Sequence, residues 1–392
     1  MTKERMKGLF ERFKGGNFTV TFWDGETCRY GQGPPVVSFI FHKPLDTTFN
    51  LDKPLLSLGE AYMDGYWDFT GEFTEIIRII EENKELLKPA GLTGKITGFI
   101  QSVTAKRQQK QNIEHHYDLG NDFFSLWLDE TLSYSCAYFK NPDDTLYQAQ
   151  INKIDHTLKK LQLKPGERLL DIGCGWGWLV IRAAQQYGVR ALGITLSDQQ
   201  YAAAGRRVKE LGLAGQVEIR LASYQDLSEQ EQQFDKIVSV GMFEHVGRDN
   251  LPRYMEQVNK LLVPGGLSLL HTITGMTEEP VNDWMEKYIF PGGYIPSLRE
   301  IIWLLPLYRF HLLHAESLRL HYAKTLDHWY NNFSRCVAKV REKFDERFVR
   351  MWSLYLRGCA ASFRVSGLDI YQLLFSKGLN NNLPMDYGFI YA

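Results

Sequence analysis

Short apolar runs and stretches of helical periodicity alternate along the middle of the chain, between residues 164 and 275. The predicted strands are 167–172, 189–194, 217–221, 234–240 and 267–272. Helical spacing occupies the stretch that ends at Tyr187, and the stretches 197–211 and 250–262. Strands that alternate with helices predict an α/β fold with a doubly wound, mostly parallel sheet. Ligands of such sheets bind at the carboxyl ends of the strands.

The first hundred residues follow a mixed pattern. Residues 19–23 and 36–41 have the apolar and β-branched content of strands, and 73–87 has helical spacing that stops before Pro89. A polar, basic stretch without apolar periodicity follows at 105–113. We therefore predict a smaller N-terminal α+β domain at 1–103, a basic linker at 104–113 and a larger domain at 114–392.

Two amphipathic stretches lie in this N-terminal part. Met6, Leu9, Phe10 and Phe13 fall on one helical face with basic residues around it, and a second stretch repeats the spacing at Ile96, Phe99, Ile100 and Val103. A basic amphipathic helix can lie in the interface of a membrane. The same pattern also fits a helix that packs on its own domain, and the pattern alone favours this second interpretation.

Composition and charge narrow the class of protein. The 392 residues carry 45 Lys and Arg against 46 Asp and Glu, so a globally basic nucleic-acid binder is excluded as the first hypothesis. No apolar run approaches the roughly 18 residues of a membrane span, and the N-terminus has no apolar signal segment. Five scattered cysteines without a C-x-x-C pair predict neither a disulfide framework nor a metal site, and they fit a cytoplasmic protein.

A glycine-rich turn follows the first predicted strand of the sheet. It begins at Asp171 and has D-x-G-x-G-x-G spacing through Gly173, Gly175 and Gly177. It lacks the Lys-Ser/Thr of a phosphate-binding P-loop, and Trp178 breaks the dinucleotide spacing G-x-G-x-x-G. The run from Leu169 to Gly177 resembles the first motif of Rossmann-like S-adenosylmethionine-dependent methyltransferases, which implies S-adenosylmethionine as the methyl donor.

One position departs from many members of that class. Their second strand often ends in Asp or Glu, which binds the ribose hydroxyls of the cofactor. Here the strand is followed by Thr195, Leu196 and Ser197. We expect neutral polar groups, Thr195 with Gln200 one helical turn on, to take that role.

Several further motifs, in order, resemble cyclopropane-fatty-acyl-phospholipid synthases and their mycolic-acid relatives. They lie at 114–124, 132–139, 241–247, 270–273, 288–297 and 321–326. The resemblance implies a catalytic domain at 114–392 with a helical substrate cover. It also implies a cofactor site formed by Tyr134, Ser135, Asp171, Gly173, Gly175, Gly177, Thr195, Leu196 and Gln200.

In that family a bound bicarbonate acts as the general base. The resemblance implies that Cys136, Glu244, His271 and Tyr322 are catalytic and hold bicarbonate together with the Ile273 backbone. Glu244 follows the fourth predicted strand and His271 ends the fifth, so both belong to the ligand-binding edge of the sheet. Each residue also has a structural interpretation taken alone, since Cys136 can be a small buried hydrophobe and His271 a core histidine.

The implied reaction adds a methylene group to the cis double bond of an unsaturated phospholipid acyl chain. Methyl transfer to an alkene leaves a carbocation, which aromatic rings such as Tyr134, Phe139, Tyr294 and Tyr322 can stabilise without attacking it. With a lipid substrate, the amphipathic N-terminal stretches are expected to dock at the inner face of the membrane. The partners are then the bilayer surface and its phospholipid, with no nucleic acid; a homodimer is left open.

Three alternatives remain at this stage. A fatty-acid C-methyltransferase on the same scaffold would give methyl-branched or methylene-bearing chains. A small-molecule N-methyltransferase would not need the bicarbonate ligands. A lipid-binding protein with a relic methyltransferase fold would not bind S-adenosylmethionine.

Overall fold

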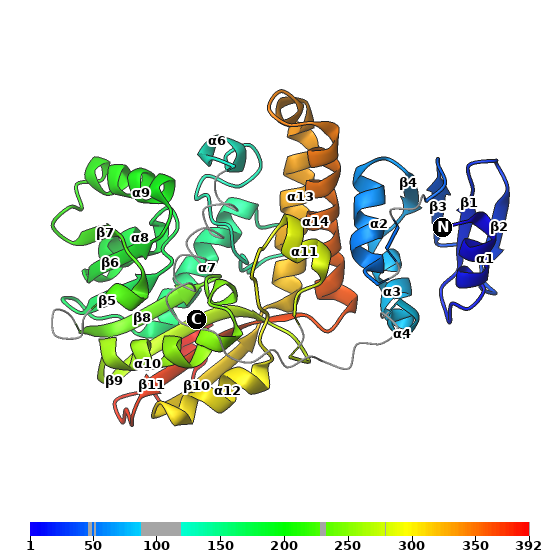
Figure 1. The fold of residues 1–392 in the computed structure, drawn as a ribbon. Coiled ribbons are helices and arrows are strands. Elements are labelled where there is room, and N and C mark those ends of the chain that lie inside the picture. Colours follow the sequence, from blue (N-terminus) through cyan, green and yellow to red (C-terminus); the bar gives the residue numbers. More distant parts are fainter. Residues whose placement is uncertain (46–48, 51, 88–118, 228–232, 279, 392) are drawn as a thin grey trace. The chain divides into compact units, whose positions relative to one another are not determined.

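The computed structural model describes residues 1–45, 49–50, 52–87, 119–227, 233–278 and 280–391 (Figure 1). Within these residues the chain forms two compact units. The first contains the described residues up to 87 together with 281–291 and 326–367, and the second contains the remaining described residues. The predicted linker at 104–113 and the second amphipathic stretch, 96–103, lie outside the described residues.

The first unit is built around a four-stranded sheet in the order β2-β1-β3-β4. Its strands are β1 (Phe18–Thr21), β2 (Thr27–Tyr30), β3 (Val37–Phe41) and β4 (Trp67–Gly71). Its helices are α1 (Lys3–Phe10), α2 (Pro54–Met63), α3 (Phe73–Glu82), α4 (Lys84–Leu87), α11 (Asp283–Tyr288), α14 (Glu346–Val365) and the part of α13 (Arg319–Arg341) that starts at residue 326. Strands were expected at β1 and β3, whereas β2 and β4 were not predicted.

The first amphipathic stretch packs partly on its own unit, which supports the interpretation of a helix that packs on its own domain. Met6 is fully buried, and Phe10 and Phe13 pack against the core around Phe18, with ring centroids 5.8 and 6.0 Å from that of Phe18. One of the basic residues beside this stripe, Lys7, forms an ion pair with Glu26 of the same unit, with 2.6 Å between Nζ and Oε1. Leu9, Phe10 and Phe13 are half-buried, so the unit covers this apolar helical stripe only in part.

The two units do not follow the predicted boundaries along the chain. The prediction placed 281–291 and 326–367 in the larger domain, whereas both segments belong to the first unit, where α11 packs on α2 and α14 packs on α2 and α3. Arg350 of α14 provides one reason, since its guanidinium donates to the Tyr62 and Trp67 carbonyls, at 2.5 and 2.9 Å, and to Asp68 at 2.7 Å. Ala361, also from α14, is buried in the same apolar core.

The second unit contains a seven-stranded sheet in the order β10-β11-β9-β8-β5-β6-β7. The five predicted strands are confirmed as β5 (Arg168–Ile172), β6 (Arg190–Thr195), β7 (Val217–Leu221), β8 (Phe234–Val240) and β9 (Leu262–Thr274), and all are parallel. Two strands that were not predicted, β10 (Phe310–Ser317) and β11 (Asp369–Lys377), add an antiparallel edge.

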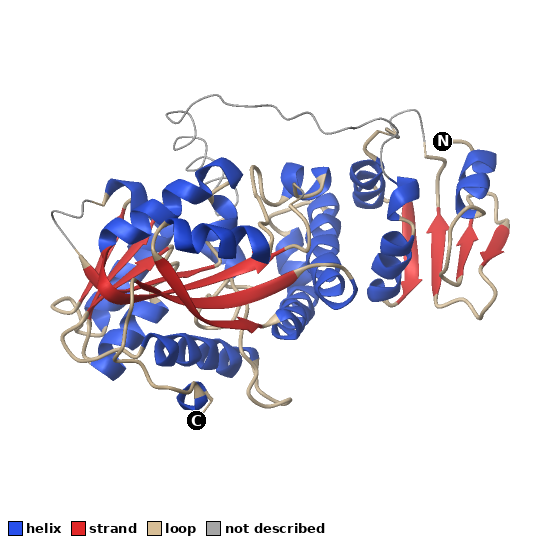
Figure 2. Ribbon diagram, turned by 90° about the horizontal axis from the view of Figure 1, so that it is seen from below, coloured by secondary structure: helices blue, strands red, loops and turns tan. Residues whose placement is uncertain are grey.

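Helices cover both faces of this sheet (Figures 1 and 2). Alternate residues of β5 face opposite ways: Leu169 packs with α7 (Leu146–Leu161) and α8 (Trp178–Tyr187), and Leu170 packs with α10 (Leu251–Leu261) and α12 (Leu298–Leu307). The remaining elements of this unit are α6 (Asn121–Phe124), α9 (Asp198–Glu210), η1 (Tyr224–Asp226), η2 (Phe243–His245), η3 (Arg248–Asn250) and η4 (Gly388–Ile390). The doubly wound, mostly parallel α/β fold is therefore confirmed.

Across the described ranges, none of the helices combines the length and the hydropathy that a bilayer crossing requires.

The packing of α1 leads to a stability prediction. Replacing the fully buried Met6 by Ala leaves a cavity and is expected to lower the unfolding free energy of the first unit by about 2–5 kcal/mol. The exposed neighbour Arg5 is the control, and Arg5→Ala is expected to change it by less than about 0.5 kcal/mol. Denaturant unfolding of the full chain measures both; equal midpoints for the two variants would contradict the assigned packing.

Candidate active site

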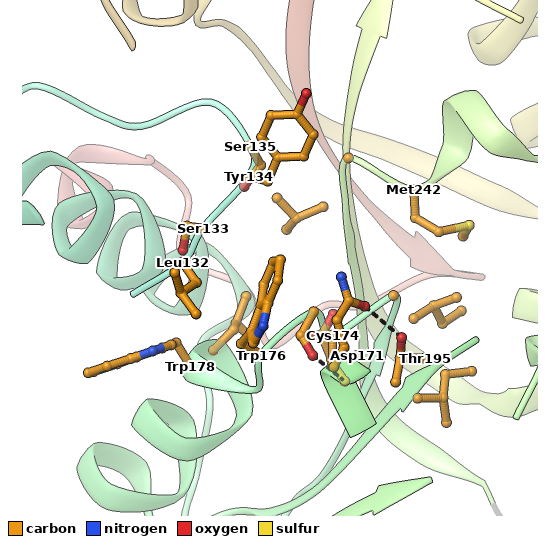
Figure 3. A pocket seen from close by; sticks show the side chains of 18 of the residues that line it. Leu132, Ser133, Tyr134, Ser135, Asp171, Cys174, Trp176, Trp178, Thr195 and Met242 are labelled. Carbon is orange, nitrogen blue, oxygen red and sulfur yellow. Dashed lines mark hydrogen bonds between the residues drawn. The ribbon is translucent and has the colours of Figure 1, made fainter. Parts of the chain in front are cut away.

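A pocket opens at the carboxyl ends of β5, β6 and β8 in the second unit (Figure 3). The glycine turn after β5 forms one side, the ends of β6 and β8 form the floor, and the loop 131–135 forms the opposite wall. Eight of the nine predicted cofactor residues line it: Tyr134, Ser135, Asp171, Gly173, Gly175, Thr195, Leu196 and Gln200.

The glycine turn brings backbone close to its neighbours at positions where a side chain would not fit. Gly173 has φ +85°, and a Cβ there would lie 2.9 Å from the side chain of Met242. Gly177 is the predicted residue that does not line the pocket. It has φ +83°, caps the start of α8, and would bring a Cβ to 3.0 Å from that of Ala204. Its role is to let α8 and α9 pack closely.

Neutral polar groups lie where β6 ends. They occupy the position at which many S-adenosylmethionine-dependent methyltransferases have an acidic residue, as the sequence predicted. The Thr195 hydroxyl donates to the Gln200 side-chain carbonyl at 2.7 Å (Figure 3), and the Ser197 N–H donates to the Thr195 hydroxyl at 3.2 Å. The Ser197 hydroxyl caps α9 by accepting from the Gln200 N–H. The predicted pair is thus brought together on the pocket wall, leaving the Gln200 amide N–H₂ to serve a ligand.

Lys153 of α7 also lines the pocket and was not singled out in the sequence. It is 4% exposed, and its ammonium donates to the Ser135 hydroxyl at 3.0 Å. Asp171 is 3% exposed on the same wall. Burial lowers the pKa of Lys153 to about 8 and raises the pKa of Asp171 to about 7. In the structure Lys153 lies on a buried stripe of α7 with Ala149 and Thr157, four residues before and after it.

Glu244 lies in η2 after β8, with its carboxylate buried. Its Oε1 accepts from the Ile273 N–H at 2.7 Å and from the Thr272 hydroxyl at 3.0 Å. Among the described residues, its Oε2 has no hydrogen-bond partner. Burial raises the pKa of Glu244, and the two donors oppose that shift. The Ile273 N–H, predicted to hold bicarbonate, is engaged by Glu244 itself.

His271 lies on β9 and is fully buried. Gln372, its register partner on β11, donates to His271 Nδ1 at 3.2 Å. Burial and the nearby Lys153 hold the pKa of His271 well below its usual range, so the ring is neutral, and an accepting Nδ1 places the proton on Nε2. That Nε2 has no partner among the described residues. Gln372 was not predicted, although a lone Gln in an apolar strand is a visible signal.

The Cys136 thiol and the Tyr322 backbone N–H both donate to the carbonyl of Leu318. The Cys136 thiol donates to the carbonyls of Ala137 and Leu318, at 3.2 and 3.8 Å, and the Tyr322 N–H donates to the same Leu318 carbonyl at 3.0 Å. Burial raises the pKa of Cys136, so the thiol keeps its proton and is not a nucleophile.

The five predicted bicarbonate ligands form separate small groups rather than one hydrogen-bonded set. Glu244 joins Ile273, Cys136 joins the turn before Tyr322, and His271 joins Gln372. The pocket wall, as far as described residues form it, contains none of the five but contains several of their sequence neighbours: Ser135, Val240, Gly241 and His245.

The four aromatic residues considered for cation stabilisation do not all line the pocket. Tyr134 lines the pocket and packs against Phe124, with ring centroids 5.4 Å apart. The buried Tyr294 donates its hydroxyl to Glu300 at 2.6 Å, and Phe139 stacks with His321. Of the four rings considered, Tyr134 is the one on the described pocket wall.

The residues present fit both groups implied by the resemblance. The glycine turn, the polar pair at the end of β6 and the unpartnered, buried Asp171 Oδ1 fit a ligand with a hydroxylated ring and a cationic group. The Nε2–H of His271 and the Oε2 of Glu244 are buried and lack partners among the described residues, and each has the chemistry to bind one atom of a small hydrogen-bonding anion such as bicarbonate.

Comparison with known proteins gives matches along most of the chain. Residues 104–373 match the family model of mycolic acid cyclopropane synthetase, and residues 5–89 match a domain of unknown function. A probable fatty acid methyltransferase of Pseudomonas putida is 39% identical, covering 91% of this chain and 90% of its own. The cyclopropane-fatty-acyl-phospholipid synthase of Escherichia coli K12 is 40% identical, and the match covers 85% of this chain and 86% of the E. coli protein.

A solved structure agrees with these matches. The crystal structure of mycolic acid cyclopropane synthase CmaA1 complexed with SAH and CTAB has a TM-score of 0.65 and 36% identity, covering 68% of this chain and 98% of that one. The chain therefore belongs to the mycolic acid cyclopropane synthetase family and is an S-adenosylmethionine-dependent methyltransferase with a Rossmann-like fold.

Proposed function

We propose that this protein transfers a methylene group from S-adenosylmethionine to the cis double bond of unsaturated acyl chains in membrane phospholipids, which forms cyclopropane fatty acids. The observation that carries the proposal is the 40% identity to the E. coli cyclopropane-fatty-acyl-phospholipid synthase, which extends over 85% of this chain. The pocket at the carboxyl edge, with its predicted cofactor residues, supports it.

The chain's own residues position the methyl donor. S-adenosylmethionine, when bound, supplies an electrophilic methyl group on a sulfonium. The glycine turn allows close approach of backbone N–H groups, and Thr195 with Gln200 offers neutral hydrogen bonds to ribose hydroxyls. Tyr134 on the opposite wall presents a π-face near which positive charge is tolerated.

The carbocation that methylation leaves on the acyl chain must lose a proton before water captures it. Bicarbonate, when bound, supplies a small base that is not covalently attached to the protein. The neutral Nε2–H of His271 donates to such an anion, and a Glu244 carboxyl with a raised pKa can keep a proton on Oε2 and donate as well. The family resemblance adds Cys136, Tyr322 and the Ile273 backbone to this proposed set. In this structure the Ile273 N–H donates to Glu244 and the Cys136 thiol donates to backbone carbonyls, so these groups would have to exchange partners to bind the anion.

The substrate implies a peripheral, cytoplasmic protein at the inner face of the membrane. Its partners are then the bilayer surface and an unsaturated phospholipid. A homodimer is compatible with this arrangement. Because Phe10 and Phe13 pack partly against the core of their own unit, we expect docking to use other surfaces as well.

A second candidate is a fatty-acid C-methyltransferase that leaves a methyl branch or a methylene group on the chain. The 39% identity to the probable fatty acid methyltransferase of P. putida, over 91% of this chain, favours it. Both reactions begin from the same cation. Loss of a proton from the new methyl group with ring closure gives the cyclopropane, and loss of a proton from the chain gives a methyl-branched alkene. A hydride shift onto the cationic carbon followed by loss of a methyl proton gives the methylene group.

The direct test uses purified protein with S-adenosylmethionine and vesicles of unsaturated phospholipid. We expect each modified chain to gain 14 mass units, the mass of CH₂, by mass spectrometry, with ring protons visible by NMR of the product. Saturated vesicles are the control and should gain nothing. Olefinic methylene or branched-methyl signals instead of ring protons would select the second candidate, and no adduct would contradict both.

Glu244→Gln tests the proposed anion site. The change keeps the side chain's shape but replaces the unpartnered Oε2 by an amide N–H₂, so we expect turnover to fall by about 100-fold or more. Binding of S-adenosylhomocysteine should change by less than about threefold, since Glu244 is not on the pocket wall. Steady-state kinetics and calorimetry measure the two quantities. Glu218→Gln on the exposed β7 is the matched control, and parallel losses of turnover and binding in Glu244→Gln would reject the assignment.

A further inference from the structure

Thr157 is a fully buried polar residue of α7 to which the proposed reaction gives no role. Its neighbours along the helix, Ile154 and Leu158, belong to the apolar core of the second unit. Its hydroxyl donates to the carbonyl of Lys153, one helical turn earlier, at 2.8 Å. A carbonyl oxygen only accepts, so the single hydroxyl proton of Thr157 is committed to this bond. The Thr157 oxygen therefore faces its other neighbours as an acceptor.

Gln372 of β11 meets that acceptor with its amide nitrogen. The nitrogen lies 3.2 Å from the Thr157 oxygen and 3.2 Å from Nδ1 of His271, the register partner of Gln372 on β9. An amide nitrogen carries two N–H donors, one for each contact. If the amide were turned over, its oxygen would face the Thr157 oxygen with no proton between them, which is unfavourable in a buried place. The orientation of the Gln372 amide thus follows from the Lys153 carbonyl.

The direction of these hydrogen bonds is passed on to His271. Because an N–H of Gln372 points at Nδ1, that ring nitrogen accepts. A neutral imidazole has one ring proton, so a ring that accepts at Nδ1 carries its proton on Nε2. The Nε2 atom is buried and has no partner among the described residues. The ring nitrogen that is left for a ligand is therefore a donor, which suits an anion.

We propose that Thr157 and Gln372 are positioning residues that hold His271 in the tautomer whose Nε2–H donates to the bicarbonate base. The inference rests on the proposed function in taking His271 as a ligand of that base. Both residues act through the imidazole ring and are not ligands themselves. Valine and leucine would occupy the same places without a polar group to satisfy, so stability alone does not call for this pair.

NMR of protein that contains ¹⁵N-labelled histidine detects the tautomer and needs no substrate. In the unmodified protein we expect a pyridine-type shift for Nδ1 and a pyrrole-type shift for Nε2 of His271, assigned by their loss in His271→Gln. Thr157→Val keeps the side-chain shape and removes the acceptor that orients Gln372, so the two shifts should move toward each other as the second tautomer is populated. Thr157→Ser retains the hydroxyl and should keep both shifts.

Turnover of vesicles of unsaturated phospholipid is measured with the same variants. We expect Thr157→Val to lower turnover by about 10- to 100-fold, as loss of the outer partner of a metal-bound histidine does, and Thr157→Ser to stay within about threefold of the unmodified protein. Gln372→Met removes both donors and should change the shifts and the turnover in the same way. It provides the test if Thr157→Val does not fold.

Ser376→Ala is the matched control. Ser376 is a fully buried hydroxyl residue on the same strand as Gln372, and its hydroxyl donates to the Gly378 carbonyl. Its loss should change neither the tautomer of His271 nor the turnover.

Three results would overturn the proposal. They are a proton on Nδ1 of His271 in the unmodified protein, an unchanged tautomer in both Thr157→Val and Gln372→Met, and a changed tautomer with full turnover. Failure of the proposed function looks different, because the unmodified protein would then show the Nε2–H tautomer and form no lipid adduct.

Discussion

Removing ionisable groups from water is the constraint that shapes the carboxyl edge of the seven-stranded sheet. Lys153, Asp171, Glu244 and His271 are all buried there, and each has its pKa moved toward the neutral form by burial. Such groups are costly to a fold unless partners satisfy them. Here the protein provides hydrogen-bond partners for only part of these groups, and Asp171 Oδ1, Glu244 Oε2 and His271 Nε2 have none among the described residues.

In Glu244 and His271, one polar atom of the side chain has hydrogen-bond partners and the other has none among the described residues. Backbone and neutral side chains hold one atom of each group: Ile273 and Thr272 bind one oxygen of Glu244, and Gln372 binds one nitrogen of His271. The second atom of each is then fixed in direction but unpartnered among the described residues. Neutral partners orient a reactive group without cancelling its capacity to donate or accept, as outer ligands do in many active sites.

The sequence predicted the parts of this fold that depend on local pattern. The parallel strands β5 to β9 follow from apolar runs, and the pairing of Thr195 with Gln200 follows from the missing acid. The strands β10 and β11 and the partner Gln372 depend on long-range register, which local periodicity does not encode. The role of the apolar face of α1 could not be decided from sequence, because an amphipathic stripe is the same against a lipid surface and against a sheet. Lys153 was missed because a lysine inside a helix ordinarily lies in solvent.

The first unit is assembled from distant parts of the chain, since α14 packs on α2 and α3 and contributes Arg350 and Ala361 to the unit formed by the first 87 residues. During synthesis these N-terminal helices therefore leave the ribosome long before α14 exists. Until then the surface of α2 and α3 that α14 covers is open to water and to other chains, so the nascent protein is expected to depend on chaperone protection. The same topology raises the sequence separation of native contacts, which slows folding. A chain that stops before α14 would lack more than its last helices, because its N-terminal unit would also be incomplete.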